Sequence, residues 1–447
     1  MIKRLIRTVL PEPILRVYHY TLAQLAAFWF RHPSEELIVI GVTGTNGKSS
    51  TTQFIGRLLE SSGERVGWTT TASFKVAEHE WVNDKKMTML GRFQTQKLLR
   101  EMVTAGCTYA IVETSSQGIV QSRHIGINYD VVAFTNLTPE HIEAHGGFEN
   151  YKNAKGKLFD RLHQLSRKVI DGREIDKCIV VNLDDAYAEY FLSFNADRYA
   201  GVTWKTIPPE LIQRLNTTPV EAQNVHFEGN CTTFSIADTT MHFKPIGRFQ
   251  LENVLVAIAT LVTLGVHKEV IQLGVESLQS VPGRLEQIEE GQPFSIIVDY
   301  AYEPVSLVAV YEAINLLNYK RLIHITGSAG GGRDVARREI LGTLSAEHDD
   351  IVIVTNEDPY DEDPMQIVNH VADAAVQAGK RDGVDLFRIL DRQEAINFAV
   401  GIAEREDLVL VTGKGSEPVM AVAHGVKIPW DDRLAVKNAV LKKYGRT

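Results

Sequence analysis

A glycine-rich stretch near the start of the chain constrains the fold more than any other feature. An apolar run at 37–40 precedes it, and a segment with helical spacing follows it from Gln53 to Leu59. In the order strand, glycine turn, helix, backbone N–H groups and a helix N-terminus can hold a phosphate group. The stretch reads Gly41-Val42-Thr43-Gly44-Thr45-Asn46-Gly47-Lys48-Ser49-Ser50-Thr51-Thr52.

Lys48 and Ser49 give this loop its chemistry. In a phosphate-binding loop the lysine reaches the β- and γ-phosphates, and the hydroxyl that follows it binds Mg²⁺. The strict motif would have glycine at 42, where this chain has valine, so the loop counted from Gly41 is one residue longer. The alternative is a simple turn of glycine, threonine and asparagine. The Lys-Ser pair directly after the glycines favours a nucleoside triphosphate site.

The bulk composition limits the remaining possibilities. A chain of 447 residues with 44% hydrophobic and 23% charged residues has the size and composition of two or three globular domains. Its net charge of −9 argues against broad binding to nucleic acid. The three cysteines, Cys107, Cys178 and Cys231, are too far apart for a metal motif and predict an intracellular, reduced protein.

Residues 1–36 form a basic and apolar N-terminal segment that predicts a short helical region. Its cations within residues 1–31 include Lys3, Arg4, Arg7 and Arg16, and an apolar run follows at 22–30. That run is too short to span a bilayer, which takes about 20 apolar residues. Two interpretations remain open: a helix packed on the protein body, which is the more common outcome, or an anchor lying on a membrane surface.

Apolar runs alternate with helical patterns over residues 37–281, which predicts a doubly wound, mostly parallel sheet with helices on both faces. Short strand-like runs between 198 and 245 indicate an antiparallel edge. The predicted strands are 37–42, 108–113, 130–135 and 178–182, and the predicted helices are 48–61, 94–105, 150–166, 184–195 and 250–264.

Val281-Pro282-Gly283-Arg284 marks a turn and a domain boundary. Residues 282–447 then repeat the alternation, which predicts a second, Rossmann-like α/β domain whose ligands lie beyond the strand C-termini. Its predicted strands are 295–300, 321–326, 351–355 and 408–412, and its predicted helices are 304–316, 334–346, 364–378, 391–403 and 432–443.

Polar residues stand where the predicted strands end. Glu113 follows one strand, and His141 follows another by a few residues. If both strands neighbour the one before the loop, the two side chains reach the phosphate site and form a Mg²⁺ or Mn²⁺ site. Taken singly, Glu113 could be a helix-cap partner and His141 a solvated loop residue. Lys155 lies among three lysines at one helix start, a pattern typical of a solvated face.

The C-terminal domain has similar clusters. A glycine-rich turn at 327–334 is either a second anion site or a flexible loop. Asp358 and Glu417 end two further strands and would suit a cationic group, although surface acidity explains them equally well.

Taken in order, these pieces resemble the Mur ligase family, and within it the members that add the third amino acid of the peptidoglycan stem peptide. The match runs from about residue 37 to the end of the chain. It rests on the ordered set Thr43–Ser49, Glu113–Ser116, Phe134–His141, His145-Gly146, Glu149–Tyr151, Ala154-Lys155, Gly247–Phe249, Asn253, Pro282–Arg284, Asp299–Ala301, Arg333-Asp334, Asp358-Pro359, Gly413–Gly415 and Asp431–Arg433.

The resemblance implies ATP-dependent amide bond formation through an acyl phosphate. It assigns phosphate binding to Lys48, one Mg²⁺ to Ser49 and Glu113, and a second to His141 together with a Lys155 carbamylated by CO₂. Residues Gly44, Thr45, Asn46, Gly47 and Ser50 complete the ATP loop. The adenine and ribose contacts fall on Asn253, Asp299 and Arg333, and the acceptor contacts fall on Ser115, Gln121 and Arg123.

Several departures from the family pattern concern the substrates. About 40 residues precede the loop, where the family has a uridine-binding domain of roughly a hundred residues, so we expect that domain to be missing. The Thr-Thr-Pro motif reads Thr88-Met89-Leu90 here. The arginine that grips the distal carboxylate of diaminopimelate is replaced by Tyr360, which cannot form the bidentate arginine–carboxylate pair.

These departures lead to two hypotheses and one rival. With Asp358 and Glu417 in place, the added amino acid is a basic one such as lysine or ornithine. The acceptor is a muramoyl dipeptide, or alternatively a lipid-linked or other peptide met at a membrane. We expect a monomeric cytoplasmic enzyme, in peripheral membrane contact through residues 1–31, without nucleic-acid partners. The rival from another class is a P-loop ATPase or nucleotide-binding regulator without ligase activity.

Overall fold

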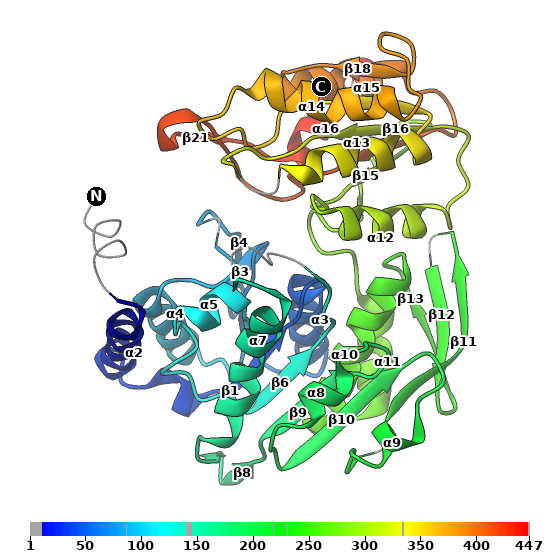
Figure 1. Cartoon of the computed structure of the whole chain (residues 1–447). Helices are drawn as coiled ribbons and strands as arrows, with labels where there is room; N and C mark the ends of the chain where they lie inside the picture. The colour runs from blue at the N-terminus through cyan, green and yellow to red at the C-terminus, as the bar shows by residue number, and fades with distance from the viewer. Residues whose placement is uncertain are drawn as a thin grey trace. The chain divides into compact units, whose positions relative to one another are not determined.

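The structure is a computed structural model, and it describes residues 11–85, 87–139, 145–217, 219–229, 231–332 and 335–445 (Figure 1). The chain forms two compact units. The first comprises residues 1–226, 233–243 and 249–278, and the second comprises residues 227–232, 244–248 and 279–447.

The first unit is built on a sheet of 11 strands in the order β13-β12-β11-β10-β9-β6-β1-β5-β2-β3-β4. Strand β1 lies inside the sheet and pairs in parallel with β5 and β6. All six residues of β1 are buried, as expected for a strand covered on both faces. The central strands are β1 (Ile38–Thr43), β5 (Tyr109–Glu113), β6 (Val131–Phe134), β9 (Cys178–Asn182) and β10 (Arg198–Thr203).

Helices cover both faces of this sheet. Alternate strand residues such as Val39, Val112 and Phe134 belong to one apolar core, which also includes Leu99 and Phe159 from two helices. The helices of the unit are α3 (Lys48–Ser61), α4 (Arg92–Thr104), α5 (Ser116–Val120), α7 (Phe148–His163), α8 (Ala188–Leu192), α9 (Pro209–Ile212), α10 (Arg248–Thr263) and α11 (Lys268–Ser277).

The prediction of an antiparallel edge over 198–245 is wrong for its first strand. Strand β10 pairs in parallel with both β9 and β11, so it continues the parallel sheet. An antiparallel edge does occur at the other end, where β3 pairs with β2 and β4. The strands at the two edges are β2 (Val66–Thr69), β3 (Ser73–Val76), β4 (His79–Val82), β11 (Val220–Glu228), β12 (Cys231–Ile236) and β13 (Thr239–Phe243).

The second unit contains a six-stranded sheet in the order β14-β15-β19-β16-β17-β18, with only β14 antiparallel to its neighbour. The predicted fold class, a mostly parallel central sheet followed by a C-terminal α/β domain, is confirmed. The elements are β14 (Glu286–Gln287), β15 (Ser295–Val298), α12 (Pro304–Ile314), β16 (Leu322–Thr326), α13 (Ala336–His348), β17 (Ile351–Val354), α14 (Pro364–Gln377), β18 (Leu386–Arg388), α15 (Arg392–Ile402), β19 (Leu408–Val411) and α16 (Asp432–Tyr444). Two further pairs, β7 (Lys168–Ile170) with β8 (Arg173–Ile175) and β20 (Val419–Ala421) with β21 (Lys427–Pro429), form small ribbons.

The chain before β1 forms helix α2 (Glu12–Trp29) and the short helix η1 (Pro33–Glu36). Ala23, Ala26 and Ala27 of α2 are fully buried, so this helix packs on the protein body. Within the described residues, no helix has the length and apolar character needed to cross a membrane.

A buried charge cluster lies at the start of β6. The Asp130 carboxylate is fully buried and accepts hydrogen bonds from Lys177 Nζ at 3.0 Å and from the backbone N–H of Val39 at 2.8 Å. It also pairs with Lys168, whose Nζ donates to the carbonyls of Ser34, Leu37 and Asn128. This cluster ties η1 to the sheet, at the end away from the glycine-rich loop.

Candidate active site

The glycine-rich loop connects β1 to α3. Gly44 has φ +154° and Gly47 has φ +79°, in the region that favours glycine. A Cβ at Gly47 would lie 2.0 Å from Asn253 Oδ1, and one at Gly44 would lie 1.9 Å from Thr135 Oγ1. Both glycines are therefore required for the loop to approach α10 and the end of β6.

Hydrogen bonds fasten the loop to the residues after β6. The backbone N–H groups of Thr45 and Asn46 donate to the carbonyl and the side-chain oxygen of Asn136, at 2.8 and 2.9 Å. Lys48 Nζ donates to the Thr45 carbonyl at 2.6 Å, which holds its ammonium group over the loop. Ser50, at the start of α3, is buried behind the loop.

Glu113 lies beside the loop because β1 and β5 are neighbours, with Val42 opposite Glu113. Ser49 Oγ donates to Glu113 Oε2 at 2.7 Å, and Thr71 donates its backbone N–H and its hydroxyl to the same carboxylate. A buried carboxylate beside a hydroxyl is the kind of hard oxygen pair that Mg²⁺ prefers, so these residues fit a magnesium ion at a triphosphate site.

His141, predicted to join this site, lies outside the described residues. In the described part of the chain, no group of three or more His, Cys, Asp and Glu side chains could hold a metal ion. The predicted meeting of Glu113 and His141 therefore stays a prediction.

Lys155 reaches the loop from α7. Its side chain is buried, in contrast to the solvated face that its lysine-rich surroundings predicted, because this side of α7 packs onto the loop and β6. Lys155 Nζ donates to the Gly44 carbonyl at 2.6 Å and lies 4.5 Å from the centre of the Tyr151 ring. The Tyr151 hydroxyl in turn lies 3.0 Å from Thr45 Oγ1. Lys48 and Lys155 thus both bond to carbonyls of one short loop.

The three predicted acceptor residues surround helix α5. The Ser115 hydroxyl caps this helix by accepting the Gly118 N–H at 3.2 Å, and Arg123 donates to Gln121 Oε1 at 2.7 Å. Arg92, which the sequence reasoning did not select, donates to the Gln121 carbonyl. Burial first, and then the Arg123 charge, lower the pKa of the Arg92 guanidinium. Two arginines beside one glutamine form a suitable site for an anionic group.

The predicted adenine and ribose contacts are distributed over both units. Asn253 is buried on α10, where its Oδ1 lies 3.3 Å from the Thr51 hydroxyl. Asp299 follows β15, and its carboxylate accepts the N–H groups of Leu285 and Ala301 at 2.7 and 2.6 Å. Burial raises the pKa of Asp299, while Arg284 opposes this shift. Arg333 lies outside the described residues.

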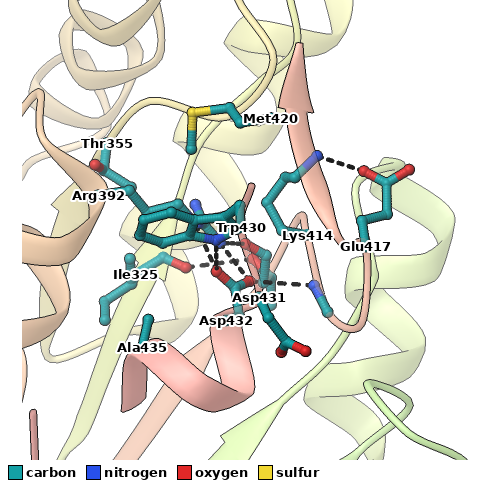
Figure 2. Close-up of polar contacts among 12 residues, drawn as sticks. Ile325, Thr355, Arg392, Lys414, Glu417, Met420, Trp430, Asp431, Asp432 and Ala435 are labelled. Atoms are coloured by element: carbon teal, nitrogen blue, oxygen red, sulfur yellow. Dashed lines mark hydrogen bonds and ion pairs between the residues drawn. The ribbon is translucent and has the colours of Figure 1, made fainter. Parts of the chain in front are cut away.

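In the second unit, Asp358 and Glu417 meet at a lysine that the sequence reasoning did not select. Lys414 Nζ pairs with Glu417 (Figure 2). It also donates to Asp358 Oδ1 at 2.9 Å, and the other Glu417 oxygen accepts the Tyr300 hydroxyl at 3.0 Å. The Lys414 side chain is fully buried, and those of Asp358 and Glu417 are 10% and 16% exposed. Both carboxylates remain partly accessible.

Glu357 is a second residue that the sequence reasoning missed. It is buried, and its Oε2 has no hydrogen-bond partner among the described atoms. Burial raises the pKa of Glu357, and the Lys414 charge opposes this shift. Tyr360 has φ +51°, uncommon for a residue other than glycine, and its ring packs beside Gly331. The run of polar residues after β17 was the only sequence signal for Glu357.

Trp430 and Asp432 hold the loop that carries Lys414. Asp432 is fully buried and accepts hydrogen bonds from Arg392 Nε at 2.7 Å, from Trp430 Nε1 at 2.8 Å and from the Gly415 N–H at 3.1 Å (Figure 2). Arg392 also donates to the Thr412 carbonyl at 2.7 Å. Helix α16 thereby fixes both ends of the segment Gly413–Gly415.

Two parts of the chain match models of known protein families. Residues 42–261 match the family model described as Mur ligase middle domain, and residues 283–415 match the model described as Mur ligase, glutamate ligase domain. The chain is 34% identical over 435 residues to the UDP-N-acetylmuramyl-tripeptide synthetase of Roseiflexus sp. (strain RS-1), covering 96% of this chain and 84% of that protein.

A second relative and two solved structures agree with these matches. The UDP-N-acetylmuramoyl-L-alanyl-D-glutamate--2,6-diaminopimelate ligase of Geobacillus kaustophilus is 33% identical, with 95% of this chain and 83% of that protein covered. A solved structure of a ligase with this name aligns with a TM-score of 0.59 at 26% identity, over 91% of this chain and 79% of that one. The folylpolyglutamate synthase of Mycobacterium tuberculosis shares the fold, with a TM-score of 0.64 at 14% identity over 98% of this chain and 100% of that one.

Proposed function

Because this chain belongs to the Mur ligase family of ATP-dependent acid–amino-acid ligases, we propose that it adds an amino acid to a muramoyl-dipeptide-like carboxylate in peptidoglycan precursor synthesis. The observation that carries the proposal is the convergence of Lys48, Ser49, Glu113 and Lys155 on one loop. The names of the relatives place them at the tripeptide step.

In the proposed reaction, a carboxylate oxygen of the acceptor attacks the γ-phosphorus of ATP, and the bond to ADP breaks. The amine nitrogen of the amino acid then attacks the acyl carbon, phosphate leaves, and the nitrogen loses a proton. Lys48 binds the phosphates, and Arg92 and Arg123 hold the anionic acceptor beside them. Asn253, Asp299 and Arg333 are proposed to bind the adenine and ribose.

Ser49 and Glu113 would hold one Mg²⁺, and His141 and Lys155 would serve a second. When bound, Mg²⁺ offsets the negative charge between the γ-phosphate and the attacking carboxylate. A lysine ammonium cannot ligate a cation, so Lys155 would take part as a carbamate formed with CO₂. Its burial beside the loop supports this role, because the modified side chain would be shielded from water there.

A bicarbonate requirement tests the proposed role of Lys155. Removing dissolved CO₂ and bicarbonate is expected to lower phosphate release by the wild-type protein, and adding bicarbonate should restore it. Lys155→Ala should lose about 10²-fold in kcat and not respond to bicarbonate. Lys157→Ala, an exposed lysine on the same helix, is the matched control and should behave like the wild type. Equal bicarbonate responses in Lys155→Ala and the wild type would contradict the carbamate.

We propose that the added amino acid is basic. Among the described residues, the carboxylates of Glu357, Asp358 and Glu417 lie around one ammonium group, that of Lys414, which leaves an excess of negative charge. Two other nearby cations are offset, Arg392 by Asp432 and Arg337 by Glu303. A side-chain ammonium group of the substrate would restore the balance, whereas the second carboxylate of diaminopimelate would add to the excess.

Phosphate release measured with a panel of amino acids tests this specificity. With ATP and UDP-MurNAc-dipeptide, lysine or ornithine is expected to give the highest kcat/KM. Glu417→Gln should raise the KM for lysine about tenfold, which corresponds to about 1.4 kcal/mol of binding free energy. The KM for alanine should change less. The control is Glu362→Gln, which removes a carboxylate paired with Arg338 in the same unit. A preference for an acidic or apolar amino acid would refute the assignment.

The remaining parts of the proposal concern the oligomeric state and the location in the cell. We propose a monomer that acts in the cytoplasm and contacts a membrane peripherally through residues 1–31. Basic residues in that segment, in a chain whose net charge is −9, support the contact.

A further inference from the structure

Helix α2 is apolar on two opposite sides. Its inner side packs Ala23, Ala26 and Ala27 against the protein, and a Cβ at Gly126 would lie 2.9 Å from that of Ala27. Arg100 of α4 donates to the carbonyls of Phe30 and Arg31 at 3.0 and 2.9 Å. The helix is thus fixed to the first unit, and its orientation on that unit is set.

The outer side of α2 carries a stripe of exposed apolar residues. Their spacing of three and four residues places them on one helix face, opposite the buried alanines. The only charged residues of α2 are Glu12 and Arg16. The stripe consists of Ile14 (51% exposed), Val17 (66%), Tyr18 (43%), Leu25 (48%), Phe28 (72%) and Trp29 (71%). Packing within the first unit leaves this face exposed, with Thr21 as its polar member, and several exposed apolar residues on one face mark an interaction site.

A shallow pocket of about 410 Å³ opens where α2 ends. Phe30 forms part of its wall, and two cations of α4 line it, Lys97 paired with Glu101 and Arg100 paired with Glu36. Lys97 is well exposed, at 66% of its side chain. A pocket with both apolar and charged walls therefore lies at the end of α2.

The sequence before α2 is basic. Residues 1–11 contain no acidic residue, and their cations are Lys3, Arg4 and Arg7. Apolar residues stand between and beside these cations, at positions 2, 5, 6, 9 and 10. Arg31 adds an exposed cation just after α2. This charge contrasts with the net −9 of the whole chain and complements an anionic surface.

We propose that the outer face of α2 lies on an anionic lipid bilayer, toward which the basic sequence before the helix is attracted. The inference rests on the proposed peripheral contact of residues 1–31 and names the face, the lipid charge and the anchoring side chains. Stable attachment takes two signals, here an apolar face and a basic segment. Trp29 and Tyr18 are residue types that favour the membrane–water interface.

The position of α2 places this contact near the proposed acceptor site. Gly126, which touches α2, lies three residues after Arg123, and Gln96 of α4 donates to the Gly126 carbonyl at 2.9 Å. The arginines that hold the acceptor therefore lie near the bilayer-facing helix in the same unit. Attachment would bring the ligase close to acceptors that are consumed or made at the membrane.

Vesicle flotation with the full-length chain tests the proposal. Vesicles with about a third anionic phosphatidylglycerol are expected to bind the protein at least tenfold better than pure phosphatidylcholine vesicles. Binding should weaken from about 0.1 M to about 1 M salt, as the Debye length falls from about 10 to 3 Å. The double variant Phe28→Ser/Trp29→Ser should lose binding at least tenfold. The matched control, Val169→Ser/Leu273→Ser, removes apolar residues 68% and 69% exposed elsewhere and should bind normally.

The inference would be overturned by no preference for anionic vesicles, by unchanged binding of the Phe28/Trp29 double variant, or by sedimentation showing that this variant converts a dimer to a monomer. The last result would assign the face to a second copy of the chain. Ligase activity on soluble substrates, measured on the same samples, should be retained by the variant. Loss of vesicle binding by the control as well would also contradict the assignment of binding to α2. If the wild-type protein bound anionic vesicles but showed no ligase activity, only the proposed function would be refuted.

Discussion

Replacing Glu113 with glutamine is expected to lower kcat by about 10²–10³-fold, because metal-assisted charge stabilisation contributes several kcal/mol and each 1.4 kcal/mol is a factor of ten. Glutamine keeps the size of the side chain and can still accept from Ser49 and Thr71. It removes the negative charge that would hold Mg²⁺. The apparent Mg²⁺ affinity, measured from the metal dependence of phosphate release, should weaken at least tenfold.

Glu174→Gln provides the control for this variant. Glu174 lies on β8 in the same unit, pairs with the exposed Arg167 and is away from the loop. Its activity should stay within about twofold of the wild type. If Glu113→Gln kept its activity and its Mg²⁺ dependence, the metal role of Glu113 would be wrong.

Replacing Asp130 with asparagine is expected to reduce the free energy of unfolding of the first unit by about 3–5 kcal/mol. The carboxylate sits between Lys168 and Lys177, and all three groups are buried. Asparagine can still accept the Val39 N–H, but it leaves two ammonium groups without their counter-charge. Urea denaturation at pH 7 measures the effect. The control is Glu406→Gln, which breaks the exposed Lys320–Glu406 pair and should cost less than about 1 kcal/mol.

The same variant should show an altered pH dependence. Burial lowers the pKa of Lys168 to about 8, even with Asp130 raising it, compared with about 10.4 for an unfolded lysine. Between these values the unfolded chain binds more protons, so stability rises with pH. Without Asp130 the pKa of Lys168 falls further, so the pH range in which stability rises with pH extends toward neutral pH. The deficit of Asp130→Asn should therefore be largest near pH 7 and shrink toward pH 10. A pH-independent deficit would exclude this charge effect.

The phosphate loop and its carboxylate could be predicted because local pattern and sheet topology determine them together. A parallel sheet aligns strand C-termini, so Glu113 reaches Ser49 once β5 lies beside β1. Lys155 could not be placed from its surroundings, because helical spacing does not show which lysine meets Gly44 across 111 residues. The family resemblance pointed to Lys155, and the structure places it at the loop.

The amino-acid site and the edge of the sheet were harder to predict. Lys414 meets Asp358 from 56 residues away, so its role depends on how β19 and β17 are arranged around β16. The direction of β10 was misjudged because short strands with alternating residues look alike in parallel and antiparallel pairing. Helix α2 was expected either to pack on the protein body or to lie on a membrane. Its buried alanines pack on the body, and its opposite, exposed apolar side leaves room for a membrane contact as well.

The two compact units divide the proposed chemistry between them. Lys48, Glu113 and Lys155 lie in the first, whereas Asp358, Lys414 and Glu417 lie in the second. The choice of the added amino acid can therefore change by substitution or recombination within one folding unit. The phosphoryl-transfer residues are then inherited unchanged. The same division offers protein engineers a route to ligases that extend peptides with non-natural building blocks, by changing residues around Asp358 and Glu417 and keeping Asp299, which the second unit contributes to the proposed nucleotide site.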